Sequence, residues 1–318
     1  MRTRLPQNGF LFPFKIMKRL LAPLFALGIL LSACTTPVDD GTGPIKLGYI
    51  GPLTGEAASY GKDTLNGALL AINEINEAGG VNGRMIELIA EDGRCTGTDA
   101  ASAAQKLVNV DKVVAIIGGQ CSGETLAAAP IAESAQVVMI SPISSSPDVT
   151  AAGDFIFRDY PSDALKTKAM AGYFKKEGIE KVAAITKNTD FAVAFRDALK
   201  ENIGDALVFD EVVEPGTKDY RSLMARLKDM EFDAFFPNGQ TPAAMAAMVQ
   251  QLREQGLTQV AISHDVAQDA SMFEIAPDAV EGLLAIGVPA VDRDSDFGTK
   301  FLAEHGEAQG ALFFAAQA

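Results

Sequence analysis

The chain has 318 residues, 48% hydrophobic and 21% charged, which is the composition of a globular protein and excludes a disordered one. At roughly 100–200 residues per domain, this length predicts about two domains. The 27 Lys and Arg residues are outnumbered by 41 Asp and Glu, and the formal net charge of −14 argues against nucleic acid or anionic lipid as a binding partner.

The first 33 residues have the pattern of a secretory signal. Lys18 and Arg19 precede the apolar run Leu20–Leu31, which is short for a membrane span of about 20 residues. The run ends in Leu31-Ser32-Ala33-Cys34, which is similar to the lipobox of bacterial lipoproteins. Residues 1–33 are therefore predicted to be a lipoprotein signal peptide, with lipid attached to Cys34. A plain secretory signal with an incidental cysteine is the alternative.

Two further expectations concern this part of the chain. Met17 directly precedes the basic pair and would give a signal of more ordinary length, so it is an alternative start. Residues 34–44 are mostly polar and show no packing pattern, so they are predicted to form a tether.

Strands and helices alternate from residue 45 to about residue 160. In the first helix Leu65, Leu69 and Ile72 recur three or four positions apart, which is the spacing of one helix face. Alternation of this kind predicts a parallel sheet with helices on both faces. The expected elements are strand Ile45–Ile50, helix Tyr60–Ala78, strand Met85–Glu91, helix Ala100–Asn109, strand Val113–Ile117, helix Glu124–Ser134 and strand Val137–Ile140.

A second alternation follows a short strand near Phe155–Pro161, where the pattern changes. It is long enough to form a sheet of its own. Its expected elements are helix Ala164–Glu177, strand Lys181–Thr186, helix Phe191–Glu201, strand Leu207–Val213, helix Asp219–Met230, strand Asp233–Pro237, helix Ala243–Gln255, strand Val260–Ser263, a short helix Ala270–Ala276 and strand Gly282–Gly287.

Together these patterns predict an α/β fold of two doubly wound parallel-sheet lobes joined by a multi-strand hinge, with crossovers near Arg158–Asp163 and Gly287–Val291. The predicted first lobe comprises residues 45–160 plus 289–318, and the predicted second lobe comprises residues 161–288. Asp292–Ala318 is expected to form one or two helices, and its apolar end, Ala311–Ala318, indicates a truncated chain. Hinged lobes of this kind suit closure around a small ligand.

Polar turns follow two strands of the first lobe. Gln120–Gly123 follows one strand, and Ser141–Ser146 follows the next. The carboxyl ends of neighbouring parallel strands open into one crevice, where such sheets bind ligands. Ser122 is predicted to be the N-cap of the following helix, with its hydroxyl capping the helix or turned to a ligand. A helix start can hold an anion such as a carboxylate.

The chain has three cysteines. If Cys34 carries lipid, Cys95 and Cys121 remain as an even pair in an oxidising compartment, which favours a disulfide between them. Two free buried thiols are the alternative.

A hydrolase is the rival class of function. Gly119–Gly123 fits a G-x-C-x-G variant of the nucleophile elbow, with Cys121 as nucleophile and His264 or His305 as base. Titration of a free thiol would separate an enzyme from a binding protein. The two histidines are isolated and lack the spacing of a metal site, so neither a metal nor a cofactor is predicted.

Several stretches together carry a family resemblance that runs in order from Ile45 to Ala318. They are IKLGYIGPLTGEAASYG, ALLAINEINEAGGVNGRMIELIAED, IIGGQCS, MISPISSSPDVT, DYRSLMARLKDMEFDAFF and AVEGLL. The chain resembles the type I periplasmic binding proteins of the leucine/isoleucine/valine group, the solute receptors of bacterial ABC transporters.

The resemblance implies roles for particular residues. The ligand carboxylate would be held by Ser122 and by the backbone N–H of Ser145, and the ammonium by Ile143, Ser145 and Asp265 from the second lobe. Aromatic contacts fall on Tyr60 and Phe191, and the family's disulfide falls on Cys95 and Cys121. Ser144, which also suits turn capping, completes the predicted ligand set together with Gln240. Gln240 stands where the family has a tyrosine, and Asp265 stands where it usually has a glutamate.

The implied function is an extracytoplasmic solute-binding lipoprotein of an ABC importer. Its ligand would be a branched-chain or related small amino acid, or an amide, bound between the lobes. The expected partners are the transporter's membrane subunits and the membrane itself, through lipid on Cys34, with no nucleic acid. The expected location is the periplasm or cell envelope, and a ligand-sensing receptor of the same fold is the alternative.

Overall fold

The computed structural model describes residues 41–288 and 292–306. The chain divides into two units, Met1–Gly43 and Pro44–Ala318, and both lobes belong to the second. The predicted signal peptide, Cys34 and most of the predicted tether lie outside the described residues, as do 289–291 and 307–318.

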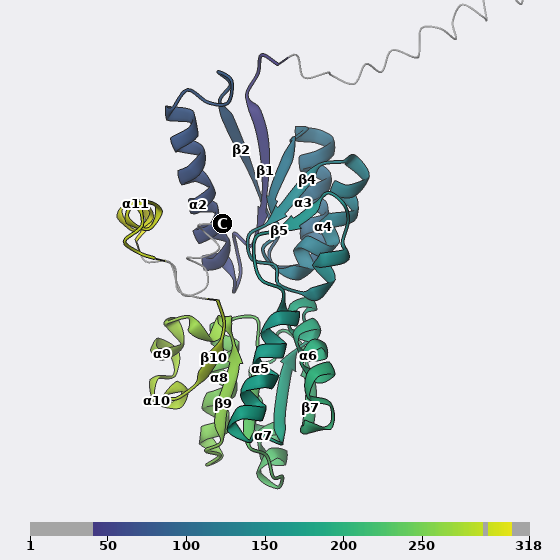
Figure 1. Ribbon diagram of the computed structural model, residues 1–318, viewed down its shortest axis with the longest axis vertical. Helices are drawn as coiled ribbons and strands as arrows, with labels where there is room; N and C mark the ends of the chain where they lie inside the picture. The colour runs from purple at the N-terminus through teal and green to yellow at the C-terminus, as the bar shows by residue number, and fades with distance from the viewer. Residues whose placement is uncertain (1–40, 289–291, 307–318) are drawn as a thin grey trace, which may run out of the picture. The chain divides into compact units, whose positions relative to one another are not determined.

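The first lobe is built on a five-stranded parallel sheet (Figure 1). Its strands are β1 (Ile45–Gly51), β2 (Ile86–Asp92), β3 (Ala115–Gly118), β4 (Val138–Ser141) and β5 (Ile156–Arg158). Their order is β2-β1-β3-β4-β5, so the chain leaves β1 toward one edge and later returns to its other side. The carboxyl ends of β1, β3 and β4 therefore lie next to one another at the point where the strand order reverses.

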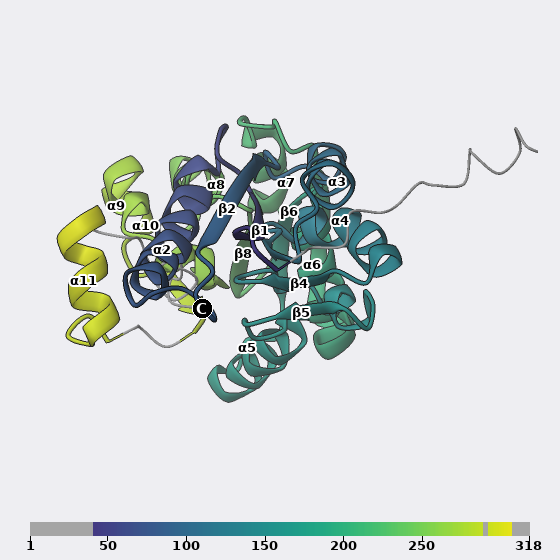
Figure 2. The ribbon, with the colours of Figure 1, turned by 90° about the horizontal axis from the view of Figure 1, so that it is seen from above.

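Helices cover both sides of β1 because adjacent residues of a strand face opposite ways. Ile50 packs with Ile116 and Met139 in the core beneath α3 (Gly97–Lys106) and α4 (Ser122–Ala135). Tyr49 points toward α2 (Ala58–Glu77), where its hydroxyl donates to the Gly61 carbonyl at 2.6 Å. Seen from above, α2 lies on one side of β1, with α3 and α4 on the other (Figure 2).

The second lobe has its own five-stranded parallel sheet, in the order β10-β9-β8-β6-β7. The strands are β6 (Val182–Lys187), β7 (Leu207–Val213), β8 (Ala234–Asn238), β9 (Val260–His264) and β10 (Leu284–Ile286). The helices are α5 (Asp163–Glu177), α6 (Asp190–Ile203), α7 (Arg221–Lys228), α8 (Pro242–Glu254), α9 (Ser271–Ile275) and α10 (Pro277–Val280). Ala184 and Phe236 belong to one core of this lobe, and Ile185 and Phe235 to another, so both faces of the sheet are buried.

This architecture confirms the predicted fold class of two doubly wound parallel-sheet lobes. The order of the strands and of the longer helices also agrees with the prediction, but the short helix α10 was not predicted and several element ends differ. The predicted helix Ala100–Asn109 starts earlier, because the Thr96 side chain accepts a hydrogen bond from the Asp99 N–H and caps α3. The helix then continues as a π turn, Leu107–Asp111, and the following strand starts at Ala115 and not at Val113.

The chain passes between the lobes where the sequence changes pattern, from β5 at Arg158 to α5 at Asp163. A second passage leads from β10 to α11 (Asp296–His305) and contains residues 289–291. Phe301 of α11 packs on Leu70 of α2, and Figures 1 and 2 both show these helices side by side. Helix α11 therefore packs against the first lobe.

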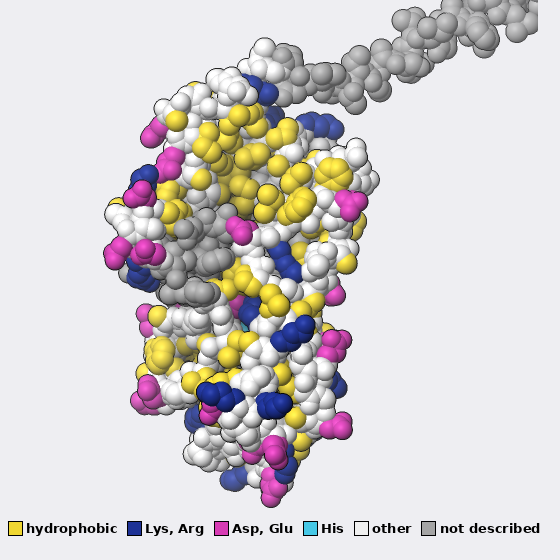
Figure 3. All heavy atoms as spheres, in the orientation of Figure 1, with side chains coloured by type: hydrophobic (Ala, Val, Ile, Leu, Met, Phe, Trp, Pro, Cys, Tyr) yellow, Lys and Arg dark blue, Asp and Glu magenta, His cyan; other side chains and the backbone are white. Residues whose placement is uncertain are grey.

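Part of the first sheet presents apolar side chains to solvent. Ile140 of β4 and Phe157 of β5 are opposite each other in the ladder and are 45% and 51% exposed. Figure 3 shows hydrophobic side chains gathered over this lobe. Among the helices of the described residues, none combines the length and apolar character needed to cross a membrane.

A disulfide joins Cys95, in the loop after β2, to Cys121, in the turn after β3, with 5.3 Å between the two Cα atoms. The predicted pairing of these two cysteines is therefore present in the structure. The bond joins the loop after β2 to the turn after β3, through two cysteines that are 26 positions apart in the sequence.

Replacing both cysteines, Cys95→Ala with Cys121→Ala, is expected to lower the free energy of unfolding by roughly 3 kcal/mol, because the unfolded chain regains the freedom of that loop. Urea unfolding followed by circular dichroism measures the change. The unaltered protein treated with a reductant serves as the control and should lose a similar amount. Equal stability with and without the bridge would contradict the prediction.

Candidate functional site

A cavity lies between the two lobes at the carboxyl ends of β1, β3 and β4. It contains about 600 Å³ of space, part of it open to solvent. Its lining combines residues of the first lobe, of the connection between the lobes and of the second lobe. The lining residues are Ala57, Tyr60, Gln120, Cys121, Ser122, Ile143, Ser145, Tyr160, Phe191, Gln240, Asp265, Val266 and Asp269.

Seven of the eight predicted ligand residues are in this lining, and only Ser144 is outside it. The structure therefore brings together residues that are as much as two hundred positions apart in the sequence. Tyr160 and Asp269 also line the cavity, although the sequence analysis did not single them out.

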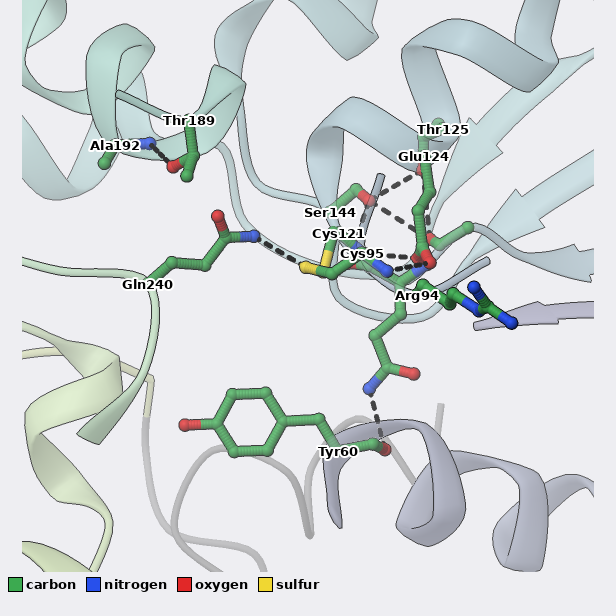
Figure 4. Close-up of a disulfide and its surroundings, with 12 residues drawn as sticks. Tyr60, Arg94, Cys95, Cys121, Glu124, Thr125, Ser144, Thr189, Ala192 and Gln240 are labelled. Atoms are coloured by element: carbon green, nitrogen blue, oxygen red, sulfur yellow. Dashed lines mark hydrogen bonds between the residues drawn. A yellow bond between two sulfur atoms is a disulfide. The ribbon is translucent and has the colours of Figure 1, made fainter. Parts of the chain in front are cut away.

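Glu124 fixes the turn after β3. Its carboxylate accepts hydrogen bonds from the backbone N–H groups of Gln120 and Cys121, both at 2.9 Å, and of Cys95 at 2.8 Å. Burial raises the pKa of Glu124, and the three N–H donors oppose that rise. Figure 4 shows this carboxylate beside the disulfide. Sequence analysis overlooked Glu124, although an acidic residue three positions after a helix cap is a recognisable signal.

Ser122 is the first residue of α4, and the N-cap is Cys121. The prediction that Ser122 is the N-cap was wrong by one position, because Cys121 has extended backbone angles and its carbonyl begins the helix. The Ser122 Oγ accepts a hydrogen bond from the Ser146 N–H at 3.2 Å. The hydroxyl proton of Ser122 therefore remains available for a second partner in the cavity.

Ser144 holds the two turns together instead of lining the cavity. Its hydroxyl lies 3.1 Å from the carbonyl oxygens of Gly119 and Gln120 and 2.7 Å from the Thr125 hydroxyl. It is 1% exposed. Ser144 is not among the residues that line the cavity, and its role as a ligand residue stays a prediction.

Ser145 connects the two lobes. Its hydroxyl donates to Asp163 Oδ2 at 2.9 Å, and its carbonyl accepts from the Asp163 N–H at 2.8 Å. Asp163 is the first residue of α5, so these bonds join the turn after β4 to the start of the second lobe.

Asp265 lines the cavity from the second lobe, but it already has a cationic partner. Lys166 Nζ lies 2.6 Å from Asp265 Oδ2 and 2.7 Å from Asp163 Oδ1. The Tyr160 hydroxyl donates to the same Asp265 oxygen at 2.5 Å. All four side chains are buried. The sequence signal for this network was Asp163 and Lys166, three positions apart in the first turn of a helix, and it was overlooked.

The charges of this network determine its protonation. Burial is the largest single effect on the pKa of Asp265 and would raise it, but the charges and hydrogen bonds of Lys166 and His264 together exceed burial and hold that pKa well below its ordinary value. Burial raises the pKa of Asp163, and Lys166 offsets this only in part. Burial acts to lower the pKa of Lys166, but the two carboxylates reverse the shift and raise it. Lys166 and Asp265 therefore form a charged pair at neutral pH.

Aromatic rings form part of the cavity wall. Phe191 packs edge-on against His264, with 4.9 Å between ring centroids, and His264 in turn lies 5.0 Å from Phe195. His264 is fully buried and its Nδ1 lies 3.4 Å from Asp265 Oδ1. Burial raises the pKa of Tyr60 well above its usual value, and the nearby carboxylates of Asp269 and Asp265 add to this. The Tyr60 side chain in the cavity lining is therefore a neutral phenol at neutral pH.

Gln240 reaches across the cavity from the second lobe. Its Nε2 lies 3.0 Å from Cys95 Sγ, and Figure 4 shows the side chain extending to the disulfide. The glutamine at this position, noted as a departure in the sequence, thus contacts the opposite lobe.

The hydrolase alternative is wrong for this chain. Cys121 is bonded to Cys95 and has no thiol to act as a nucleophile. Within residues 41–288 and 292–306, no group of three His, Cys, Asp or Glu side chains is arranged to hold a metal ion.

Comparison with known proteins agrees with this geometry. A family model described as "Periplasmic binding protein" matches residues 44–317. The chain belongs to the periplasmic binding protein family.

Relatives and solved structures support the assignment. The chain is 31% identical over 255 residues to the leucine-, isoleucine-, valine-, threonine- and alanine-binding protein of Pseudomonas aeruginosa, covering 79% of this chain and 68% of the relative. It is 30% identical over 246 residues to the Leu/Ile/Val-binding protein of Escherichia coli K12, covering 76% and 66% respectively.

Two solved structures with different ligands are also similar. The branched-chain amino acid substrate-binding protein LivJ of Streptococcus pneumoniae, in complex with isoleucine, has a TM-score of 0.76 and 27% identity, covering 86% of this chain and 81% of that one. A solute-binding protein of Rhodopseudomonas palustris, in complex with 3,4-dihydroxybenzoic acid, has a TM-score of 0.72 and 25% identity, covering 86% and 77%. This periplasmic binding protein is accordingly a solute-binding protein and not an enzyme, and its family places it in the periplasm.

In this periplasmic binding protein, Lys166→Met is expected to lower the free energy of unfolding by about 3–5 kcal/mol, because it leaves Asp265 buried without a counter-ion. Urea unfolding at pH 7 measures the loss. Lys168→Met is the matched control, since Lys168 lies exposed on the same helix, and it should change stability by less than about 0.5 kcal/mol.

The pH dependence separates the charge from the packing of the lysine stem. A depressed pKa means that Asp265 stabilises the fold above its unfolded value of about 3.9 and that this stabilisation is lost as the pH falls through the lower folded value. The difference in the free energy of unfolding between the unaltered protein and Lys166→Met should therefore become smaller below about pH 4. A gap of the same size at pH 3 and pH 7 would show that lost packing causes the effect.

Proposed function

We propose that this periplasmic binding protein is the solute-binding component of an ABC importer and that it binds a small amino acid, branched-chain or related, or its amide, in the cavity between the lobes. The observation that carries the proposal is the position of Ser122, in the cavity lining and at the first residue of α4.

The ligand carboxylate is assigned to this end of the cavity. The Ser122 oxygen already accepts a hydrogen bond from the Ser146 N–H. The Ser122 hydroxyl can therefore still donate its own proton, and a ligand carboxylate is a suitable acceptor. The start of α4 adds the positive end of a helix dipole. A hydrogen bond to an ionised group is roughly twice as strong as one between neutral groups, which favours a carboxylate over a neutral oxygen here.

The ligand's apolar part is assigned to the rest of the lining. Ala57, Ile143, Phe191 and Val266 offer carbon surface for it, as the lining of small-molecule sites usually does. The Pseudomonas relative is named for leucine, isoleucine, valine, threonine and alanine, and LivJ was solved with isoleucine, so the ligands named for these similar proteins are small amino acids, most of them branched. Closure of the lobes over such a ligand would give the form that the membrane subunits recognise.

Aromatic carboxylates are the second candidate class of ligand. The Rhodopseudomonas structure holds 3,4-dihydroxybenzoic acid, and Tyr60, Tyr160 and Phe191 supply aromatic surface in this cavity. Both classes share a carboxylate, so both are consistent with Ser122 and differ at the other end of the ligand. A sensing receptor would use the same cavity without a transporter.

Isothermal titration with L-leucine, L-isoleucine, L-valine, L-leucinamide and 3,4-dihydroxybenzoate tests the function. We expect an amino acid to bind most tightly, and Ser122→Ala to weaken its binding by about tenfold to 100-fold, because a charged hydrogen bond is lost. Ser102→Ala, which changes an exposed serine of α3, is the control and should bind as the unaltered protein does. Failure of every compound to bind would contradict the proposed function.

The lipid anchor is proposed separately. The motif Leu31-Ser32-Ala33-Cys34 supports lipidation of Cys34 after removal of residues 1–33. Expression in a bacterial host with labelled palmitate should label the protein and place it in the membrane fraction, and Cys34→Ala should remove both properties. A labelled Cys34→Ala protein, or an unlabelled unaltered one, would contradict lipidation at this site.

A further inference from the structure

Two carboxylates line the cavity from the same short segment of the second lobe. Asp265 begins the 3₁₀ turn Asp265–Gln268, and Asp269 directly follows it. Both are buried, at 4% and 6% exposure. No Lys, Arg or His is among the described residues that line the cavity. The net charge of the site therefore depends on which cationic groups contact Asp265 and Asp269 from outside the cavity lining.

Asp265 already has a cationic partner within the protein, which it shares with Asp163. The Oδ2 atom of Asp265 lies 2.6 Å from Lys166 Nζ and accepts a hydrogen bond from the Tyr160 hydroxyl at 2.5 Å. Lys166 is only 5% exposed and also contacts Asp163, so it is held in place by two carboxylates. A ligand ammonium that took over Asp265 would have to displace a buried cation from both of its partners, which is unfavourable.

Asp269 has no such partner. Its Oδ1 accepts from the Ser271 N–H at 2.9 Å. Within the described residues, no cation and no hydrogen-bond donor lies on its second oxygen, Oδ2. A buried carboxylate left without a counter-charge is costly, and a cation bound in the cavity would remove that cost. Tyr60 lies close enough for the charge of Asp269 to add to the rise of its pKa, after the larger effect of burial.

We infer that Asp269, and not Asp265, receives the protonated amine of the ligand, and that Lys166 occupies the place at Asp265 that the amine would otherwise take. The inference rests on the proposed function and narrows it to carboxylates that also carry an amine. Ser122 then binds the carboxylate from the first lobe and Asp269 binds the ammonium from the second. An aromatic acid without an amine would leave Asp269 unneutralised and is rejected.

The test compares leucine with 4-methylpentanoate, which is leucine without its amine, and isoleucine with 3-methylpentanoate. Titration calorimetry gives the affinity ratio within each pair, which reports the contribution of the amine. In the unaltered protein we expect the amino acid to bind at least about tenfold more tightly. Asp269→Asn should bring that ratio close to one, mainly by lowering the affinity for the amino acid. The amide of the asparagine keeps an oxygen that accepts from the Ser271 N–H but carries no charge.

Two further variants identify the acid. Asp265→Asn should leave the affinity ratio unchanged in protein that folds, since Lys166 already compensates Asp265. Asp278→Asn removes one exposed charge from α10, away from the cavity, and should change neither affinity. The ratio, unlike a single affinity, does not move if a variant only loosens the structure.

The outcomes distinguish failure of the inference about Asp269 from failure of the proposed function. If the unaltered protein binds an amino acid and Asp269→Asn keeps the full ratio, the inference is overturned and the proposed function stands. If Asp265→Asn alone abolishes the ratio, the inference is likewise overturned. If the unaltered protein binds neither member of either pair, the proposed function fails and the inference fails with it.

Discussion

The buried contact of Lys166 with Asp265 and Asp163 is the interaction on which the site depends. It joins the first turn of α5 to the loop after β9, and Asp265, Val266 and Asp269 of that loop line the cavity. Taking these charges out of water is costly, and the cost is offset because Lys166 contacts both carboxylates and the Tyr160 hydroxyl donates to Asp265. As a consequence for binding, Asp265 already has a cationic partner in the absence of a ligand.

The first lobe supplies the opposite wall through a different kind of bonding. Glu124 gathers three backbone N–H groups of two loops, the disulfide fixes the same loops covalently, and Ser144 ties the turn after β3 to the turn after β4. Within the described residues, the Ser122 hydroxyl proton at the start of α4 has no acceptor, because its oxygen only accepts from the Ser146 N–H. With the assignments proposed above, the first lobe would receive an anion and the second a cation, which would match a zwitterion bound between them.

Much of the fold could be predicted from the sequence, because local pattern determines it. The spacing of Leu65, Leu69 and Ile72 and the short β-branched runs gave the elements and the two alternations, and these fix a parallel sheet with helices on both faces. Boundaries were less accurate. Ser122 was placed at the cap and proved to be the first helical residue, since the choice depends on the backbone angles of Cys121, which residue types do not specify.

The sequence by itself determined which residues could meet in the crevice: the turns after adjacent strands, the even cysteine pair and an acid from the second lobe. Only the tertiary structure decided what those residues are free to do. Ser144 and Ser145 are neighbours of one type, yet the first faces inward and the second lines the cavity. Asp265 and Asp269 are both acids, but Lys166, 99 positions from Asp265, approaches only the first. Contacts over such separations depend on how the lobes pack, and no local pattern encodes them.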